Sequence, residues 1–227
     1  GGRGVIRVWT FPDDGSPPLD PIELDPVHKG GIGGLAFRPP PPSPSSGGES
    51  FDGVTCLASA GDDGVVVLWR WDSRGPAAAE HQPLALSRPE LGERKGINDL
   101  AFGPEGRKLA AAASDGAVYL WNLQDQGWRP GEVEVEQPQS LKGHREPVTC
   151  VAISPDGQTL ASGGEDNAVN LWGFEGGDVA RLGWRPLVGH TDDVTDLAFS
   201  PDGNLLASTG ADEAVVLWEV PARVALH

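Results

Sequence analysis

The sequence predicts an all-β protein assembled from repeated antiparallel sheets, and three observations lead to that prediction. Large apolar residues recur with a period near two in short runs, such as Val194, Leu197 and Phe199 and then Val215 and Leu217, which is the period of a half-buried strand. Tetrapeptides such as SPDG at 154–157 and 200–203 separate these runs, and Pro, Asp and Gly together favour tight turns. The same order of runs and turns recurs along the chain, which indicates copies of one structural unit.

Four full copies of the unit follow one another, and a partial copy precedes them. The full copies open on HKGGIGGLAF, ERKGINDLAF, HREPVTCVAI and HTDDVTDLAF and close on Trp69, Trp121, Trp172 and Trp218; the partial copy, GVIRVW, closes on Trp9. Within a copy the pattern is strand, turn, strand, turn, strand, and a variable segment follows that is long enough for a fourth strand. We therefore expect half a unit at 1–27 and full units at 28–92, 93–143, 144–189 and 190–227.

Composition excludes several classes of partner. Seventeen Lys and Arg stand against 33 Asp and Glu, a formal net charge of −16, which repels phosphate backbones and anionic lipids. No apolar run approaches the roughly 20 residues that span a bilayer, and the first residues, GGRGVIRVWTF, lack the apolar segment of a signal peptide. Cys56 and Cys150 each lie in an alternating run, and neither is near a second Cys or a Cys/His cluster, so we expect buried thiols and no metal site. These features predict a cytoplasmic protein without cofactor, nucleic-acid or membrane binding.

The units resemble WD40 repeats, with GH near the start, SPDG in the first hairpin, an Asp in the second and a Trp near the end. The resemblance covers essentially the whole chain. It implies a WD40-type β-propeller, in which each unit forms a four-stranded blade and the blades pack radially around a channel. We expect four complete four-stranded blades plus a partial blade of a larger ring. The half unit and the missing initiator Met indicate a piece of a longer protein, and a compact four-blade ring is the alternative.

The resemblance also assigns the histidines. In this family a His, a Ser or Thr, an Asp and a Trp of one blade form a hydrogen-bonded chain. The matching residues are His28, Ser59, Asp63 and Trp69, then His144, Ser162, Asp166 and Trp172, and then His190, Ser208, Asp212 and Trp218. The second unit has Glu93, Ala111, Asp115 and Trp121 instead. We expect it to be the least stable complete blade, because its hydrogen-bonded chain is incomplete.

A histidine oriented by a carboxylate is also what general base catalysis needs. Catalytic sets are usually unique, whereas this one occurs three times, so we predict a structural role and no catalytic residues. The chain contains neither GxSxG nor a phosphate-binding GxxxxGK[ST]. A hydrolase or lyase that uses the propeller channel is the alternative function.

Propellers of this family mostly bind proteins or peptides around the channel mouth, so the resemblance implies a non-catalytic interaction scaffold or sensor domain in a larger multidomain protein. The partner would be a protein, a peptide or another domain of the parent chain. The candidate rim consists of the charged loop residues Lys29, Asp62, Arg94, Lys95, Arg145, Glu165, Asp192 and Glu213. A rim that is only solvated is the alternative.

Two irregular features complete the sequence. The segment 38–53, RPPPPSPSSGGESFDG, replaces the first hairpin turn of its unit and is expected to be a loop on the opposite face, either a tolerated insertion or a docking motif. WRP occurs at 128–130 and 184–186, where a Trp could pack an outer strand or anchor a partner.

Overall fold

The computed structural model describes residues 3–9, 20–39, 55–71, 96–123, 138–175, 178–181 and 186–220. Within these ranges the regular structure consists of antiparallel strands without a helix. Accordingly, the described part holds no helix of the length and apolarity needed to cross a membrane. The sequence therefore predicted the all-β class correctly.

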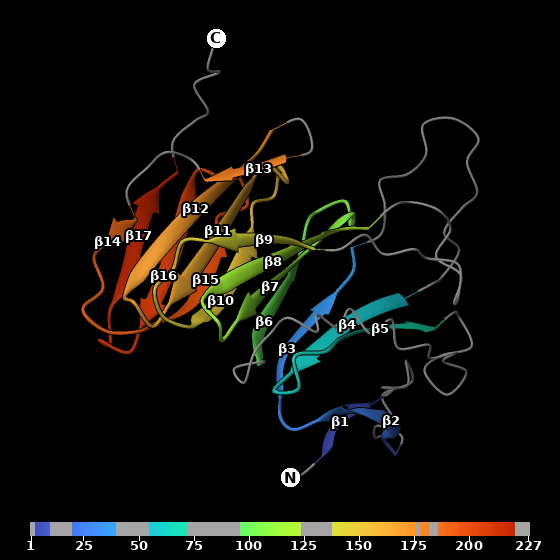
Figure 1. The fold of residues 1–227 in the computed structure, drawn as a ribbon. Helices are drawn as coiled ribbons and strands as arrows, with labels where there is room; N and C mark the ends of the chain where they lie inside the picture. The colour runs from blue at the N-terminus through green and yellow to red at the C-terminus, as the bar shows by residue number, and fades with distance from the viewer. Residues whose placement is uncertain are drawn as a thin grey trace, which may run out of the picture.

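Five sheets follow one another in chain order (Figure 1). We call them the half-blade and blades 1 to 4. The half-blade consists of β1 (Arg3–Val8) and β2 (Ile22–Lys29); blade 1 of β3 (Ile32–Phe37), β4 (Thr55–Gly61) and β5 (Val66–Trp71); blade 2 of β6 (Ile97–Phe102), β7 (Lys108–Ala113), β8 (Ala117–Asn122) and β9 (Gln139–Lys142); blade 3 of β10 (Val148–Ile153), β11 (Thr159–Gly164), β12 (Ala168–Glu175), β13 (Asp178–Arg181) and β14 (Leu187–Val188); and blade 4 of β15 (Val194–Phe199), β16 (Leu205–Gly210) and β17 (Val215–Glu219).

The turn tetrapeptides form the first hairpin of each blade from 2 to 4. In blade 3 the N–H of Gly157 donates to the Ser154 carbonyl at 2.8 Å, and Gly157 has φ +68°, a conformation that glycine adopts without steric cost. The second hairpin also needs a left-handed residue, which is Gly in blades 1 and 2. Blades 3 and 4 use Asn167 and Glu213 there, at φ +62° and +63°.

The variable segment supplies a fourth strand in two different ways. In blade 2, β9 pairs with β8 as one continuous strand. In blade 3, β13 pairs with the end of β12 and β14 with its beginning, so the fourth strand is split into two pieces. In blades 1 and 4 the corresponding segments lie outside the described residues, as do residues 40–53, the first WRP and the Trp of the second.

The apolar core lies between successive blades. Leu68 of blade 1 belongs to the same buried cluster as Leu100 of blade 2, and Leu120 of blade 2 to the same cluster as Val151 of blade 3. Each blade thus presents one set of side chains to the preceding blade and another to the following one. A single blade buries neither set alone, which is the basis of stability in repeat folds.

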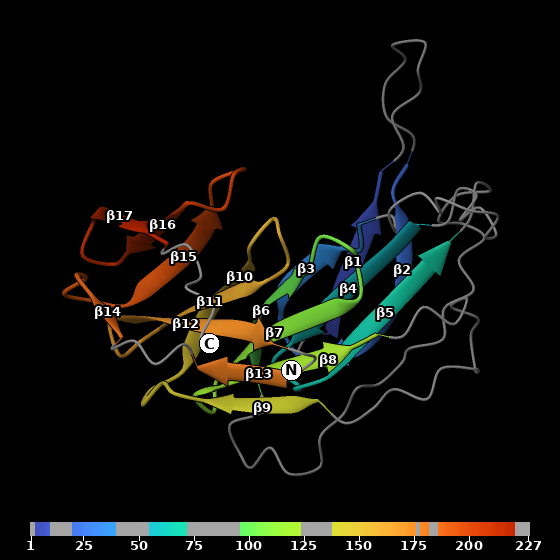
Figure 2. The same ribbon diagram turned by 90° about the horizontal axis from the view of Figure 1, so that it is seen from above.

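The row of blades is open at both ends. Figure 2 shows β1 and β17 at opposite ends of an arc, and no strand of the half-blade pairs with a strand of blade 4 among the described residues. The half-blade packs on the outer part of blade 1, against Trp69, but Leu35 and Phe37 on the inner strand are 52% and 64% exposed. The described chain therefore forms part of a propeller and not a closed ring.

Candidate functional site

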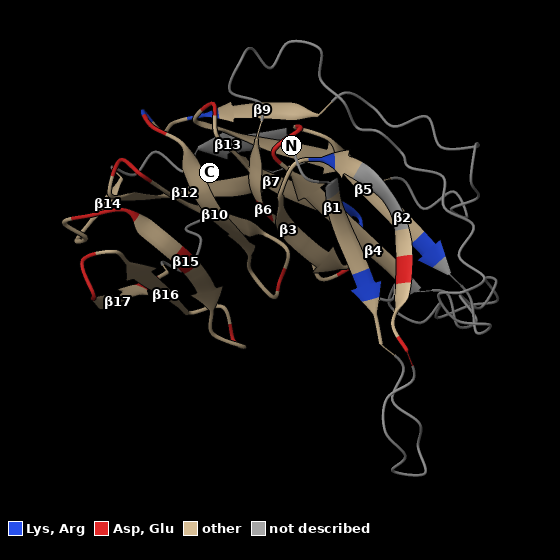
Figure 3. Ribbon diagram, turned by 90° about the horizontal axis from the view of Figure 1, so that it is seen from below, with Lys and Arg blue, Asp and Glu red and all other residues tan. Residues whose placement is uncertain are grey.

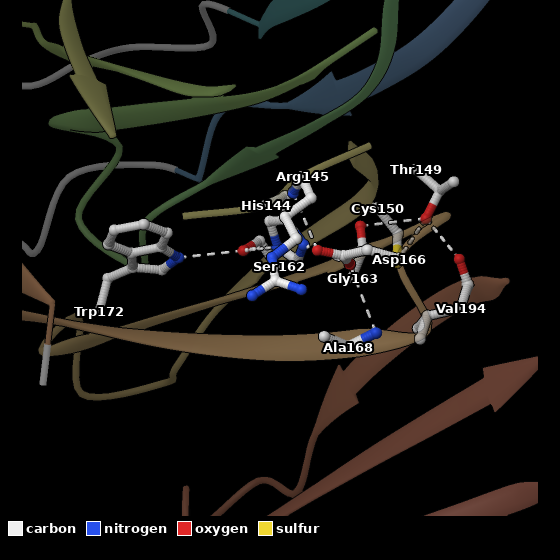
Figure 4. A network of polar contacts seen from close by, with 10 residues as sticks. All are labelled: His144, Arg145, Thr149, Cys150, Ser162, Gly163, Asp166, Ala168, Trp172 and Val194. Carbon is white, nitrogen blue, oxygen red and sulfur yellow. Dashed lines mark hydrogen bonds and ion pairs between the residues drawn. The ribbon is translucent and has the colours of Figure 1, made fainter. Parts of the chain in front are cut away.

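A hydrogen-bonded chain of four side chains crosses blade 3 (Figure 4). His144 precedes β10, Ser162 lies on β11, Asp166 in the second hairpin and Trp172 on β12. His144 Nδ1 is 2.8 Å from Asp166 Oδ1, and His144 Nε2 is 2.8 Å from Ser162 Oγ. Trp172 Nε1 donates to Ser162 Oγ at 3.0 Å. Asp166 also accepts the backbone N–H of Arg145 at 3.0 Å, which joins the loop before β10 to the second hairpin.

The same chain of contacts occurs in blade 4 and also at blade 1, where the histidine comes from β2 of the half-blade. His28 Nδ1 lies 3.2 Å from Asp63 and its Nε2 lies 2.8 Å from Ser59, which accepts the Trp69 Nε1–H at 2.8 Å. In blade 4, His190 Nδ1 lies 3.0 Å from Asp212 and its Nε2 lies 2.7 Å from Ser208, which accepts the Trp218 Nε1–H at 2.8 Å. The backbone N–H that follows each histidine donates to the aspartate here too, from Lys29 at 2.7 Å and from Thr191 at 2.9 Å.

These contacts resemble a Ser-His-Asp catalytic triad in connectivity but not in access. A carboxylate only accepts, so the Nδ1 of His144 carries the proton toward Asp166 and its Nε2 accepts from the Ser162 hydroxyl. A catalytic serine must present its oxygen to a substrate. Ser162 is fully buried, and its oxygen already accepts the indole N–H of Trp172. The geometry therefore joins strands and does not present a nucleophile.

Hydrogen bonds lower the pKa of two of these aspartates. The Thr191 N–H and then His190 donate to Asp212 and hold its pKa at about 2. Burial acts to raise the pKa of Asp166, but the bonds from His144 and from the Arg145 N–H outweigh burial, so its pKa also lies below the ordinary value. Both carboxylates are therefore held ionised by the folded chain.

Because the pKa of Asp212 is depressed on folding, its ionised form stabilises the native state above the ordinary aspartate pKa. That stabilisation is lost as pH falls from about 4 to about 2. We expect the thermal midpoint to fall over this window, and Asp212→Asn to make the fall shallower, when unfolding is followed by circular dichroism. Glu219→Gln, at an exposed carboxylate of the same blade, is the control. An unchanged slope in Asp212→Asn would contradict the assignment.

The predicted rim residues lie at one end of the sheets, where the loops before the first strands meet the second hairpins. The described members, Lys29, Asp62, Arg145, Glu165, Asp192 and Glu213, are all exposed. Asp62 Oδ2 accepts the Gly31 N–H at 2.7 Å, so this side chain also fixes its loop. Arg94 and Lys95 lie outside the described residues, as does Glu93. Figure 3 shows Asp and Glu gathered on the loops around β14, β15 and β17.

The comparisons with known proteins agree with this geometry. The family model described as WD domain, G-beta repeat matches residues 88–122, 135–173 and 184–219. Each of these ranges covers the first three strands of one blade, and only the end of β12 extends past its range. These three stretches of the chain are WD40 repeats. The WD40 unit of blade 1 lies largely outside the matched ranges, yet it has the same strand order and the same four polar contacts as blades 3 and 4.

Three curated relatives match this chain over only part of their own lengths. The chain is 26% identical to "Protein groucho" of Drosophila melanogaster over 78% of its own length and 20% of the relative's. It is 26% identical to "Transducin-like enhancer protein 2" of Mus musculus over 78% of its own length and 19% of the relative's. It is 31% identical to "Probable cytosolic iron-sulfur protein assembly protein 1" of Kluyveromyces lactis over 37% of its own length and 25% of the relative's. The chain thus spans at most about a quarter of these relatives' lengths.

Blade 2 departs from the WD40 pattern, and Tyr119 takes over part of the missing network. Its hydroxyl donates to Asp115 Oδ2 at 2.6 Å, where a histidine binds the aspartate in the other blades. Ala111 offers no acceptor to Trp121, whose buried Nε1 has no hydrogen-bond partner among the described residues. The sequence indicated that this blade lacks the His and Ser, but it did not reveal the role of Tyr119, because a strand tyrosine usually signals only β propensity.

Restoring the serine of blade 2 is expected to stabilise the chain. Ala111→Ser places a hydroxyl where Ser162 accepts from Trp172, so Trp121 Nε1 gains an acceptor and unfolding should cost about 1 kcal/mol more. Urea denaturation measures the change. Ala112→Ser, the adjacent and equally buried position on β7, is the control and should destabilise, because its hydroxyl is added among apolar side chains. A loss of stability in Ala111→Ser would show that the hydroxyl does not reach Trp121.

Three further side chains connect neighbouring WD40 blades, and sequence reasoning missed them. Asn98 Nδ2 donates to the Val148 carbonyl at 2.6 Å, and Asp99 Oδ2 accepts the Val151 N–H at 2.9 Å. Thr149 donates to the Val194 carbonyl, as Figure 4 shows. Burial raises the pKa of Asp99. The available signal was two adjacent polar residues, ND in INDLAF, that interrupt the strict alternation of a strand.

Proposed function

We propose that the chain is a segment of a non-catalytic protein-interaction scaffold that binds a protein or peptide at the rim of its propeller. The observation that carries this proposal is the set of exposed charged side chains at one end of the sheets. They lie on loops and second hairpins that are joined by hydrogen bonds to Asp63, Asp166 and Asp212. In blade 3 the Arg145 N–H bonds Asp166, and the exposed Glu165 precedes that aspartate in the hairpin. Fixed loops lower the entropy that binding must overcome.

The charges of the rim favour a partner with a mixed or net positive surface. Asp192 and Glu213 of blade 4 and Glu165 of blade 3 are carboxylates, whereas Arg145 and Lys29 supply positive charge. The net charge of −16 disfavours nucleic acid and anionic membranes as partners. Cys56 and Cys150 are free thiols, which fits a reducing compartment, and we propose a cytoplasmic location.

Enzymatic use of the channel has less support. The three His, Ser and Asp sets are engaged in buried contacts between strands, and the described residues contain no group of three or more His, Cys, Asp or Glu arranged to hold a metal. Binding therefore accounts for the exposed rim residues better than a hydrolase or lyase does.

Charge reversal at the rim tests the proposal. The variant Arg145→Glu, Glu165→Lys, Asp192→Lys, Glu213→Lys should fold with a change of about 0–1 kcal/mol for each exposed charge. Proteins that the parent chain retains from a cell extract should be lost or retained more weakly, with an altered salt dependence. The readout is quantitative mass spectrometry of the retained proteins.

A charge swap at the opposite end of the sheets is the matched control. Glu105 and Arg107 form an exposed ion pair 3.5 Å apart in the first hairpin of blade 2, so Glu105→Lys with Arg107→Glu exchanges two charges away from the rim. This control should retain the same proteins as the parent. Loss of binding in the control and not in the rim variant would move the site to that opposite end.

A further inference from the structure

The second hairpin of blade 2 exposes an aspartate that the other blades largely enclose. Asp115 is exposed. In blades 1, 3 and 4 the equivalent side chains, those of Asp63, Asp166 and Asp212, are 10%, 13% and 9% exposed. Each of the four aspartates follows the end of the second strand of its blade by two residues. The difference therefore lies in the groups that bind the carboxylate and not in its place along the chain.

Three donors hold the aspartate of each of these other blades. In blade 3 the Nδ1 of His144 lies 2.8 Å from Asp166. The N–H groups of Arg145 and Ala168 donate to the same carboxylate at 3.0 and 3.4 Å. The aspartates of blades 1 and 4 have the equivalent three donors. A carboxylate has about four acceptor positions, so these donors fill most of them.

The described residues supply Asp115 with two donors only. The Ala117 N–H donates to Oδ1 at 3.0 Å, and the Tyr119 hydroxyl donates to Oδ2 at 2.6 Å. One hydrogen bond is therefore missing in comparison with the other blades. Because the side chain is exposed, that acceptor position can be reached by a donor from another molecule.

The buried end of the same network is also incomplete in blade 2. In the other blades a serine and a histidine connect the tryptophan to the aspartate. Trp121 is 3% exposed, and its Nε1 has no hydrogen-bond partner among the described residues, because Ala111 has no hydroxyl. Asp115 is therefore not committed to a network that crosses the blade, and Tyr119 alone orients its Oδ2.

Asp115 lies next to the rim residues of blade 3. A Cβ added to Gly116 would lie 3.2 Å from the Glu146 carbonyl oxygen, so the hairpin of Asp115 touches the loop that carries the exposed Arg145. The net charge of −16 attracts basic molecules to the whole chain. The bonds from Ala117 and Tyr119 hold the carboxylate in one orientation, which lowers the cost of binding such a molecule there.

We propose that Asp115 binds a basic side chain of the partner, the guanidinium of an arginine or the ammonium of a lysine. The basic group takes an acceptor position of the carboxylate that a donor of the chain itself fills in the other blades. A hydrogen bond between ionised groups is stronger than one between neutral groups. The inference rests on the proposed function, because it names one contact of the same rim and the chemistry of its partner.

The tyrosine beside Asp115 reports on this contact directly. Tyr119 is the one tyrosine of the sequence, so the chain labelled with carbon-13 in its tyrosine ring gives a single set of ring signals in NMR spectra. Addition of amidated tetra-arginine or tetra-lysine at about 0.15 M salt should shift these signals until they saturate. The reason is that the bound cation shares the carboxylate that accepts the Tyr119 hydroxyl. Tetra-glutamate should leave the signals unchanged.

Substitutions separate recognition by Asp115 from a structural role. Asp115→Asn should weaken the binding of tetra-arginine, measured by calorimetry, by at least about tenfold, since a charge-assisted hydrogen bond is lost. Tyr119→Phe removes a donor of the hairpin but keeps the carboxylate, so it should retain binding, which a purely structural role of the pair would not predict. Glu219→Gln removes an exposed carboxylate of blade 4 and should leave the affinity within about twofold.

Three results would overturn the proposal. The first is an unchanged Tyr119 signal at saturating concentrations of both basic peptides, a result that needs no variant and stays decisive if Asp115→Asn does not fold. The second is equal affinity of tetra-arginine for the parent and for Asp115→Asn. The third is an equal loss of affinity in Asp115→Asn and Glu219→Gln, because the peptide would then respond to net charge alone.

Retention of proteins from a cell extract distinguishes this inference from the proposed function. If the fourfold rim variant loses the retained proteins while Asp115→Asn keeps all of them, the Asp115 contact is wrong and the rim remains the binding surface. If the fourfold rim variant keeps all of them, the proposed function is wrong, and the titration followed at Tyr119 still decides whether Asp115 binds a basic group.

Discussion

Leu120→Ala is expected to lower the free energy of unfolding by about 2–5 kcal/mol, whereas Leu217→Ala should change it by less than about 0.5 kcal/mol. The two leucines occupy the same position in the third strands of blades 2 and 4. Leu120 is 2% exposed and Leu217 is 67% exposed. Truncating Leu120 removes buried apolar surface and leaves a cavity between two blades, while truncating Leu217 removes surface that water already contacts.

Urea denaturation followed by tryptophan fluorescence and by circular dichroism measures both variants. The two probes must give coincident transitions before the free energies are compared, since repeat proteins can lose cooperativity. Leu68→Ala, at the same position in blade 1 and also buried, serves as a second buried example and should resemble Leu120→Ala. A large loss in Leu217→Ala would show that blade 4 is covered in solution.

The difference between these leucines marks a limit of sequence reasoning. The runs GVVVLW, GAVYLW and EAVVLW predict the same strand and the same inward leucine, and the structure contains those strands. Whether the leucine is buried depends on the presence of the next blade. Leu35 and Leu100 show the same effect at the first strand, with one exposed and the other buried. Burial in a repeat protein is a property of neighbouring units and not of the unit itself.

Side chains that act between blades were also hidden from the sequence. Gly33 stands where blade 2 has Asn98, and a Cβ there would collide with the Ile97 carbonyl oxygen. Blades 1 and 2 thus meet through close backbone approach, whereas blades 2 and 3 meet through Asn98 and Asp99. Period-two patterns record which face a residue takes within one sheet, and they do not record which blade it contacts.

His144→Ala should lower the free energy of unfolding by about 1–3 kcal/mol, the cost of leaving buried polar groups without partners. The side chain of His144 is 1% exposed. Its removal takes the acceptor from the Ser162 hydroxyl and one donor from Asp166. Asp166 keeps the N–H of Arg145 and that of Ala168, so the second hairpin retains part of its anchorage and the blade should still fold.

Arg145→Ala is the matched control, and the two variants together separate structure from recognition. Arg145 is exposed, and its contact to Asp166 comes from the backbone N–H, which alanine keeps, so its free energy of unfolding should change by less than about 0.5 kcal/mol. Below its thermal midpoint His144→Ala should retain the same proteins from an extract as the parent, while Arg145→Ala should retain them more weakly. If His144→Ala unfolded like the parent and yet lost binding or an activity, His144 would act at a functional site, and the buried chain would not be its role.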